Sequence, residues 1–361
     1  MPIWGTAWSL LSCIQGDENK LRLFSLLAFR ISVSLRRSAE VRGVLFRLLG
    51  PLVETCSREK EIQMKISIAA AALLVLAGSA VAQPTIDGFR DGSYGGPLVV
   101  QNTQTQFGDS NQGNSRFANG SELNAGYARV EGGVLYLLLT GNLESNFNKL
   151  EIFIDSRAGG QNVLRGDNPD VDFNGLNRMA GLRFDSGFSP DYWLTSTGGD
   201  TGGGNYGYFV NFAELLTNGG GAGGYVGGNN GDGANALTGG SGLGIFAGID
   251  NSNTGGVDAG NGAFLGGGTL DVETGMEFAI PLSLLGNPTT EFCIRAFING
   301  GSHDFLSNQL LGGINGGNNL GNPTNVDLSL TAGTCFTVVV PTPGATALLG
   351  LAGLVGLRRR R

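Results

Sequence analysis

The sequence predicts an all-β protein, a two-sheet antiparallel sandwich with long loops rich in glycine and asparagine. Apolar residues between positions 83 and 340 recur with a period of two, which is the period of a strand and not of a helix. Gly, Asn, Asp and Ser separate these short runs, as expected for turns between strands. The chain also holds 63 Gly among its 361 residues, and each Gly disfavours a helix by about 1 kcal/mol relative to Ala.

The clearest strand signal is the apolar run 134–139, which is typical of a central strand covered on both faces. The two-residue alternation is also visible at 150–155, 276–280, 292–298 and 336–340. Weaker strand patterns lie at 98–101, 125–131, 182–185, 191–195, 206–212, 244–251 and 326–330. Single helical turns are expected only at 213–216 and 282–285.

The most glycine-rich part of the chain is 198–268, with runs such as 219–221 and 227–230. We expect long, mobile loops here, carried by the two strands at 206–212 and 244–251. No short regular period is present, so the sequence does not predict a solenoid.

A secretory signal peptide is expected at residues 64–82. A lysine and an apolar segment follow Met64, and Ala80 and Ala82 form a small-x-small cleavage site directly before Gln83. Such a signal implies export through the inner membrane and cleavage by signal peptidase.

Residues 1–63 precede this signal peptide, although a signal peptide belongs at an N-terminus. We therefore interpret residues 1–63 as the product of a mis-assigned start that is not translated. A genuine N-terminal extension with basic and apolar stretches is the alternative.

The exported segment is more acidic than the whole chain, whose net charge is −7. Residues 83–343 hold nine Lys and Arg against 24 Asp and Glu, which gives a net charge of −15. A nucleic-acid partner needs a basic surface, so this class of partner is excluded. His303 is the only histidine, so mechanisms that need two histidines are excluded as well, including most zinc sites.

The segment 340–361 combines three features in a fixed order. Residues Val340, Pro341, Thr342 and Pro343 lead into 14 uncharged residues at 344–357, and Arg358, Arg359, Arg360 and Arg361 end the sequence. This order resembles the PEP-CTERM sorting signal, with Thr342 where the family usually has Glu. The resemblance implies processing by an exosortase-type enzyme, transient anchorage in the membrane, and placement of the passenger at the cell surface or in the extracellular matrix. An ordinary tail anchor is the alternative.

Four short motifs in the passenger 83–339 resemble DOMON-type or family 9 carbohydrate-binding-module sandwiches. They are Thr-Ile-Asp-Gly at 85–88, the apolar run at 135–139, Ile-Phe-Ile-Asp at 152–155 and Glu-Phe-Ala-Ile-Pro-Leu at 277–282. The resemblance implies an extracellular, jelly-roll-like β-sandwich that binds sugars. Trp193, the only tryptophan of the passenger, is a candidate sugar platform, but a core aromatic on a strand is the interpretation that we prefer.

Cys293 and Cys335 are the only cysteines of the passenger, and the expected compartment is oxidising. If their strands pair, the two Cβ atoms can reach bridging distance. The sequence therefore predicts a disulfide, with two buried thiols as the alternative.

The densest run of oxygen ligands is 167–175. Asp170, Asp172 and Asn174 alternate before Gly175, like the first half of a calcium loop. The closing bidentate Glu is missing, since Gly181 takes its place. A calcium site and a solvated Asx-rich turn are both open, and no other cofactor is expected.

No catalytic constellation is visible in the sequence. His303 and Asp304 are adjacent, so on an extended chain they would point to opposite faces and could not form a dyad, and we expect a surface turn there. We therefore expect a non-catalytic protein that binds carbohydrate or serves as a structural component of the exopolysaccharide layer. A secreted glycan hydrolase or lyase on the same scaffold is the alternative.

Overall fold

The computed structural model describes residues 83–231, 236–253, 268–331 and 333–341, with the backbone alone at 108–113. The expected extension 1–63, the signal peptide with Ala80 and Ala82, and the sorting residues from Thr342 to Arg361 lie outside the described residues. Within the described part, no helix has the length and apolar character needed to cross a membrane.

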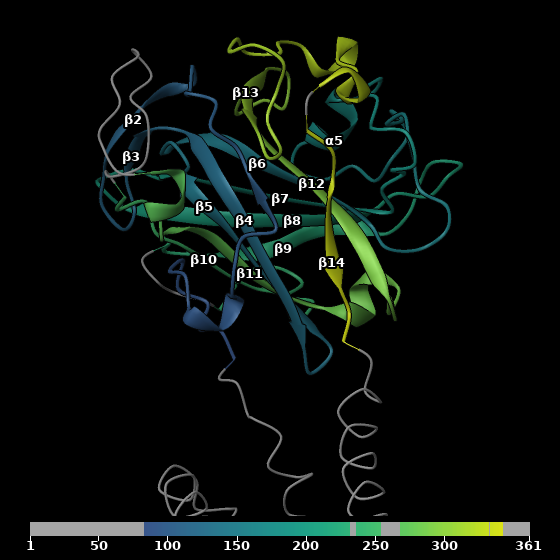
Figure 1. Ribbon diagram of the computed structural model, residues 1–361, viewed down its shortest axis with the longest axis horizontal. Coiled ribbons are helices and arrows are strands. Elements are labelled where there is room, and N and C mark those ends of the chain that lie inside the picture. Colours follow the sequence, from purple (N-terminus) through teal and green to yellow (C-terminus); the bar gives the residue numbers. More distant parts are fainter. Residues whose placement is uncertain (1–82, 232–235, 254–267, 332, 342–361) are drawn as a thin grey trace, which may run out of the picture. The chain divides into compact units, whose positions relative to one another are not determined.

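Two antiparallel sheets form the body of the protein, which confirms the predicted sandwich (Figure 1). The five-stranded sheet has the order β1 (Val99–Val100), β4 (Glu122–Glu131), β5 (Val134–Asn142), β11 (Gly275–Pro281) and β10 (Phe246–Ile249). The seven-stranded sheet has the order β13 (Leu306–Leu310), β12 (Glu291–Asn299), β6 (Asn146–Asp155), β7 (Tyr192–Asp200), β8 (Tyr206–Glu214) and β9 (Gly223–Asn229), and β14 (Phe336–Val339) also pairs with β12. A separate hairpin joins β2 (Gly108–Gly113) and β3 (Ala118–Gly120).

The helical elements that the structure describes are all short. They are α5 (Gly175–Arg178), η2 (Gly92–Tyr94), η3 (Thr269–Asp271), η4 (Leu282–Leu285), η5 (Pro323–Asn325) and η6 (Leu328–Leu330). The helical turn expected at 282–285 is therefore confirmed. The turn expected at 213–216 is wrong, because Ala213 and Glu214 complete β8 and pair with β7.

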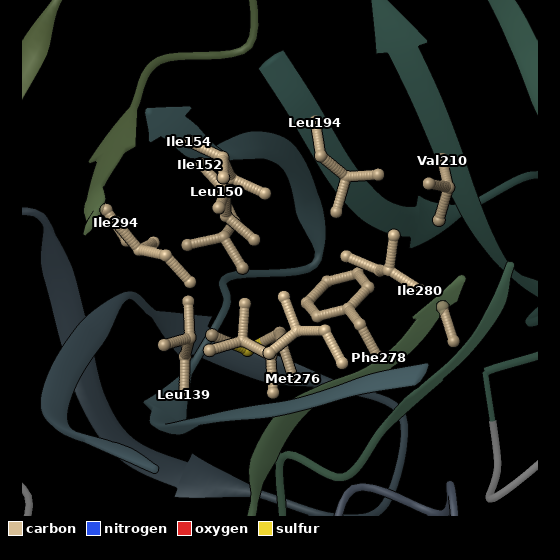
Figure 2. Packing of buried hydrophobic residues seen from close by; sticks show 14 of the residues in the cluster. Leu139, Leu150, Ile152, Ile154, Leu194, Val210, Met276, Phe278, Ile280 and Ile294 are labelled. Carbon is tan, nitrogen blue, oxygen red and sulfur yellow. The ribbon is translucent and has the colours of Figure 1, made fainter. Parts of the chain in front are cut away.

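The main core lies between the two sheets, where side chains of alternate residues meet (Figure 2). The seven-stranded sheet contributes Leu150, Ile152, Ile154, Leu194, Val210 and Ile294, and the five-stranded sheet contributes Leu135, Leu137, Leu139, Met276, Phe278 and Ile280. All twelve side chains are fully buried. Each such burial stabilises the fold by about 1.5–3 kcal/mol, which makes this core the main stabilising element.

Both sheets are also covered on their outer faces. Phe153, Trp193 and Phe297 on the outer face of the seven-stranded sheet pack against residues of the segments 164–188 and 306–328. On the outer face of the five-stranded sheet, Tyr127 and Leu138 pack against Ile86 and Tyr94 of the N-terminal segment. These extra layers explain why β5 reads as a continuous apolar run.

Glu277 of β11 fixes this N-terminal segment in place. Its Oε2 accepts hydrogen bonds from the backbone N–H groups of Asp87 and Gly88, both at 2.9 Å. Its Oε1 accepts a hydrogen bond of 2.7 Å from the Tyr94 hydroxyl. Burial raises the pKa of Glu277 to about 7, although these three donors act in the opposite direction. The motifs at 85–88 and 277–282 are thus in direct contact.

Two of the expected strands are absent. The segments 182–185 and 326–330 form only single bridges, from Arg183 to Val163 and to Asp327. Their apolar residues, such as Phe184 and Leu328, pack down onto the outer face of the seven-stranded sheet. The alternation of apolar residues in these two segments therefore reflects packing of one face onto the sheet and not pairing with a neighbouring strand.

The glycine-rich segment is more regular than expected, since β7 extends to Asp200 and β9 adds an edge strand. Several glycines serve to admit aromatic rings. A Cβ on Gly207 would lie 2.5 Å from the Phe209 ring, and one on Gly228 would lie 2.8 Å from it. The ring of Phe209 therefore covers two residues that have no side chain of their own, a known way to protect strand glycines.

Candidate functional site

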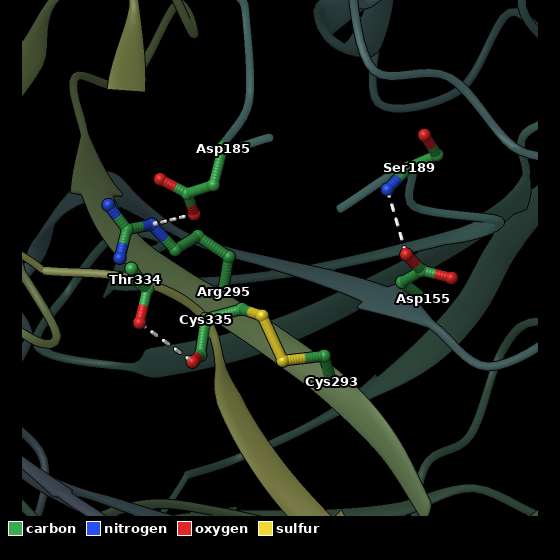
Figure 3. Close-up of a disulfide and its surroundings, with 7 residues drawn as sticks. All are labelled: Asp155, Asp185, Ser189, Cys293, Arg295, Thr334 and Cys335. Atoms are coloured by element: carbon green, nitrogen blue, oxygen red, sulfur yellow. Dashed lines mark hydrogen bonds and ion pairs between the residues drawn. A yellow bond between two sulfur atoms is a disulfide. The ribbon is translucent and has the colours of Figure 1, made fainter. Parts of the chain in front are cut away.

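The predicted disulfide between Cys293 and Cys335 is present (Figure 3). Cys293 lies in β12, and Cys335 directly precedes β14, whose four residues pair with Glu291 to Ile294 of β12. The two cysteines belong to the outer face of the sheet, where Arg295 is also fully buried. The guanidinium of Arg295 donates to Thr331 Oγ1 at 2.8 Å and lies 3.5 Å from Asp185 Oδ2.

The run expected to bind calcium does not direct its oxygen atoms to one point. Asp170 is exposed, whereas the side chain of Asp172 is directed inward to Lys149 and His303. Asn174 Oδ1 accepts a hydrogen bond of 2.7 Å from Asn177. Among the described residues, no three carboxylate, cysteine or histidine side chains cluster as a metal site would require.

Asp172 belongs to a buried ionic cluster, which consists of Lys149, Glu151, Asp172 and His303. The imidazole lies between two carboxylates, with Nδ1 2.6 Å from Glu151 Oε1 and Nε2 2.8 Å from Asp172 Oδ2. Lys149 Nζ donates to the same Oδ2 at 2.8 Å. All four side chains are at most 7% exposed. When His303 is protonated, two positive and two negative charges balance inside the protein.

The cluster shifts the pKa of two of its members. Burial alone would lower the pKa of His303, but the charge of Glu151 and the hydrogen bond to Asp172 raise it to about 9. Burial likewise opposes ionisation of Asp172, but His303 and Lys149 lower its pKa to about 2. The charged form of both groups is therefore the stable one near neutral pH.

Sequence reasoning placed His303 in a surface turn, and this is correct for the backbone only. His303 N–H donates to the carbonyl of Gly300, closing the turn, but the side chain is 2% exposed. Its φ of 60° lies in the left-handed region that non-glycine residues rarely adopt. A lone histidine carries no sequence signal for partners that lie more than 130 residues away.

The turn Asp172–Phe173–Asn174 is the most unusual backbone feature of the site. Its three residues have φ values of 46°, 54° and 62°, which lie in the left-handed region that non-glycine residues rarely adopt. Asp172 is held by the buried ionic cluster, and the backbone N–H of Gly175 bonds to the carbonyls of Val171 and Asp172. These contacts fix the turn on both sides.

Phe173 lies at the centre of this turn and is 92% exposed. No other large apolar side chain that the structure describes is so open to solvent; the next is Leu330 at 72%. The sequence reasoning missed Phe173, because it counted only the oxygen ligands of the run. Trp193, in contrast, is fully buried, and its Nε1 donates to Glu151 Oε2 at 2.8 Å. Trp193 is therefore the core aromatic of the preferred interpretation and offers no open ring face.

A polar cavity of about 340 Å³ lies at the other end of β6. We call it the Asp191 cavity; its lining consists of Arg157, Ala158, Gly159, Gly160, Asp191, Leu215, Leu216 and Thr217. Arg157 Nη2 forms an ion pair of 2.6 Å with Glu214, and its guanidinium lies over the Tyr192 ring. The sequence did not single out these residues, because they come from three separate strand ends.

Comparison with known proteins gives no family assignment for the geometry described above. No protein-family model, no curated protein and no solved structure matches this chain.

Proposed function

We propose that the protein is a non-catalytic, secreted β-sandwich of the DOMON or family 9 carbohydrate-binding-module kind, which binds carbohydrate in the extracellular polysaccharide layer. The observation that carries this proposal is the ring of Phe173, 92% exposed on a turn that is held from both sides.

A strained turn of this kind needs a reason. Residues in sparsely populated φ regions cost about 1–3 kcal/mol each, and they persist mainly at ligand clamps and other functional sites. Exposure of Phe173 adds the cost of an apolar ring left in water. The buried ionic cluster offsets this strain by holding Asp172. Its contacts thereby keep the Phe173 ring exposed on a strained turn.

The chemistry around the ring favours a sugar. The C–H face of a sugar ring is apolar and packs on an aromatic face, while its rim of hydroxyl groups seeks polar partners. Asp170 and Asn174 flank Phe173, and both are exposed. Their oxygen atoms can accept hydrogen bonds from the hydroxyl groups of a sugar.

The position of the turn suits a protein that is attached at its C-terminal end. Figure 1 shows α5, which follows the turn, in the upper part of the sandwich, and the end of β14 in its lower part. We propose that signal peptidase and an exosortase-type enzyme process the chain and that it acts at the cell surface or in the matrix. The disulfide supports this location, since disulfides persist in oxidising compartments.

The test compares Phe173→Ala, Phe173→Trp and the wild type for binding to a glycan array and to polysaccharide extracted from the producing cells. We expect the Ala variant to lose at least tenfold in affinity and the Trp variant to retain binding. Leu330→Ala, at the second most exposed large apolar side chain among the described residues, is the matched control and should bind like the wild type. Equal binding by Phe173→Ala, or no binding by the wild type, would refute the proposal. Release of reducing ends from the polysaccharide would indicate an enzyme instead.

A further inference from the structure

The outer face of the strands β6 to β9 carries three aromatic side chains, Phe147, Phe209 and Tyr225, which we call the aromatic strip. Phe209 follows Tyr208 of the main core along β8, so its ring is directed to the outer face. Tyr225 lies on the same face, because the next residue of β9, Val226, is directed into the core. Phe147 is 36% exposed, Tyr225 is 40% exposed and Phe209 is half-buried. A ligand can therefore reach all three rings from solvent.

Glycines bring two of these rings close to the backbone of the sheet. Gly199 of β7 lies directly opposite Gly207 of β8, so both positions belong to one face. A Cβ on Gly199 would lie 2.8 Å from two atoms of the Phe147 ring. A Cβ on Gly207 would lie 2.5 Å from the Phe209 ring. The two rings therefore lie against neighbouring strands at adjacent positions, and the backbone beneath them fixes their height above the sheet.

A β-bulge directs Phe147 onto this face. The register between β6 and β7 shifts between Asn146 and Lys149, where two residues of β6 face one residue of β7. Bulges redirect side chains and are over-represented next to active sites. Phe147 has a φ of 70°, which is an outlier for a bulky residue. The bulge and this φ together hold an aromatic ring in a position where 36% of it remains exposed.

The aromatic strip continues the surface on which Phe173 lies. Lys149 of β6 lies opposite Thr197 of β7, and Thr197 lies opposite Phe209 of β8. Lys149 Nζ donates to Asp172, the residue before Phe173. The Phe173 turn therefore borders this face on the side of β6, and β9 forms the other border. Neighbouring strands are about 4.8 Å apart, so β6 and β9 are separated by about 14 Å. One sugar ring is too short to cover this distance, whereas a polymer chain can span it.

The charges of these strands disfavour an acidic polymer. Lys149 is the one cationic side chain in β6 to β9, but it is 7% exposed and already pairs with Asp172. Asp200 at the end of β7 is exposed and would repel an acidic ligand. The aromatic strip itself is uncharged. Thr201, which lies beside Gly207, is also exposed, and its hydroxyl group can accept a hydrogen bond from a sugar.

We propose that the aromatic strip extends the Phe173 site into a surface that binds one chain of a non-acidic polysaccharide. The chain crosses β6, β7, β8 and β9, and its successive sugar rings stack on Phe147, Phe209 and Tyr225. The Tyr225 hydroxyl can form a hydrogen bond with a sugar hydroxyl. This inference rests on the proposed carbohydrate-binding function and names the class of its ligand. Affinity should therefore increase with the number of sugar units until the chain spans the four strands.

The experiment uses polysaccharide extracted from the producing cells and cut into fragments, which are separated by charge on an anion exchanger and then by length. Calorimetric titration of the wild-type protein compares fragments of two and of eight sugar units. We expect the long non-acidic fragments to bind at least tenfold more tightly than the short ones. Acidic fragments of the same length should bind at least tenfold more weakly than the non-acidic ones.

Variants test the aromatic strip directly. Phe147→Ala/Tyr225→Ala should weaken binding of the long fragments at least tenfold and remove the dependence on length. Tyr225→Phe keeps the ring and should retain most of the affinity. Phe209→Leu keeps an apolar cover over the glycines, so it provides a second variant if the double variant does not fold, and it should weaken binding severalfold. Phe89→Ala is the matched control, because Phe89 is 48% exposed on the N-terminal segment that covers the other sheet.

The outcomes separate this inference from the proposed function. If Phe173→Ala loses binding but the aromatic-strip variants bind like the wild type, the inference is wrong and the proposed function stands. The inference is also wrong if short fragments bind as tightly as long ones, or acidic fragments as tightly as non-acidic ones. If the wild type binds no fragment at all, both the inference and the proposed function are wrong.

Discussion

Nε2 of His303 and Nζ of Lys149 both lie 2.8 Å from the same oxygen atom of Asp172. Asp172 is thus the point at which the turn before α5, the strand β6 and the turn after β12 are joined. Since removal of one partner from a buried ion pair leaves an uncompensated charge, these three segments depend on one another for stability.

The first prediction concerns alkaline pH. The folded-state pKa of His303 is about 9, above the ordinary value of 6.5, so its contribution to stability is fully present below pH 6.5 and is lost as pH rises through 9. The free energy of unfolding should fall by about 3 kcal/mol across this window.

His303 is the only histidine of the chain, so its ring-proton NMR signal can be followed without assignment. A midpoint near pH 9 in the folded protein would agree with the prediction, and a midpoint near 6.5 would contradict it. The His303→Gln variant should lack this part of the pH dependence of unfolding.

The second prediction concerns Gly175, which packs against the imidazole. A Cβ on Gly175 would lie 2.2 Å from Cδ2 and 2.3 Å from Nε2 of His303. Gly175→Ala should therefore displace the ring and destabilise the protein by about 1–3 kcal/mol in urea unfolding. Gly224→Ala is the control, because nothing lies within 4 Å of a Cβ at that position. Equal midpoints for the two variants would argue against tight packing at His303.

The third prediction concerns the disulfide. Cys293 and Cys335 are 42 residues apart in sequence, and closure of a loop of this size stabilises a protein by roughly 4 kcal/mol in the chain-entropy model. The double variant Cys293→Ala/Cys335→Ala should lose about this much in urea unfolding. Addition of reductant should lower the unfolding free energy of the wild type toward that of the variant. The unfolding free energy of the variant should not change. A wild type that is insensitive to reductant under unfolding conditions would contradict the prediction.

The fourth prediction concerns Glu277 beneath the N-terminal segment. Its folded-state pKa of about 7 exceeds the ordinary value of 4.5, so its contribution to stability is fully present below pH 4.5 and is lost as pH rises through 7. Glu277→Gln cannot ionise, and it should reduce the difference in unfolding free energy between pH 4.5 and 7.5 by about 3 kcal/mol. Chemical denaturation at the two pH values provides the measurement. The same difference in both proteins would show that Glu277 does not titrate in this range.

The sequence was sufficient for features that depend on local alternation. The strands around 150–155, 276–280 and 292–298 were visible because each places every second side chain in the core. The disulfide followed from the same pattern, since it needed only the pairing of two such strands.

The sequence was insufficient where distant segments pack on an outer face. Phe184 and Leu328 alternate like strand residues, yet they cover the sheet without joining it. Lys149, Glu151 and His303 come together only after β6 and β12 pair and the 165–175 segment folds over them. The edge strand β9 could not be predicted from the sequence, because Gly228 has no side chain that would contribute to an apolar alternation. The ring of Phe209 in the neighbouring strand covers Gly228 instead.

The position of Cys335 has a mechanical consequence. A pulling force applied at Val340 would peel β14 from β12 one residue at a time, from the Val339–Glu291 pair inward to Phe336–Ile294. The next residue is Cys335, which is covalently bound to Cys293. Peeling therefore stops after four residues, a length of about 13 Å, and further load passes directly into β12 within the sheet. The disulfide limits how far tension on the C-terminal end can unravel the sandwich.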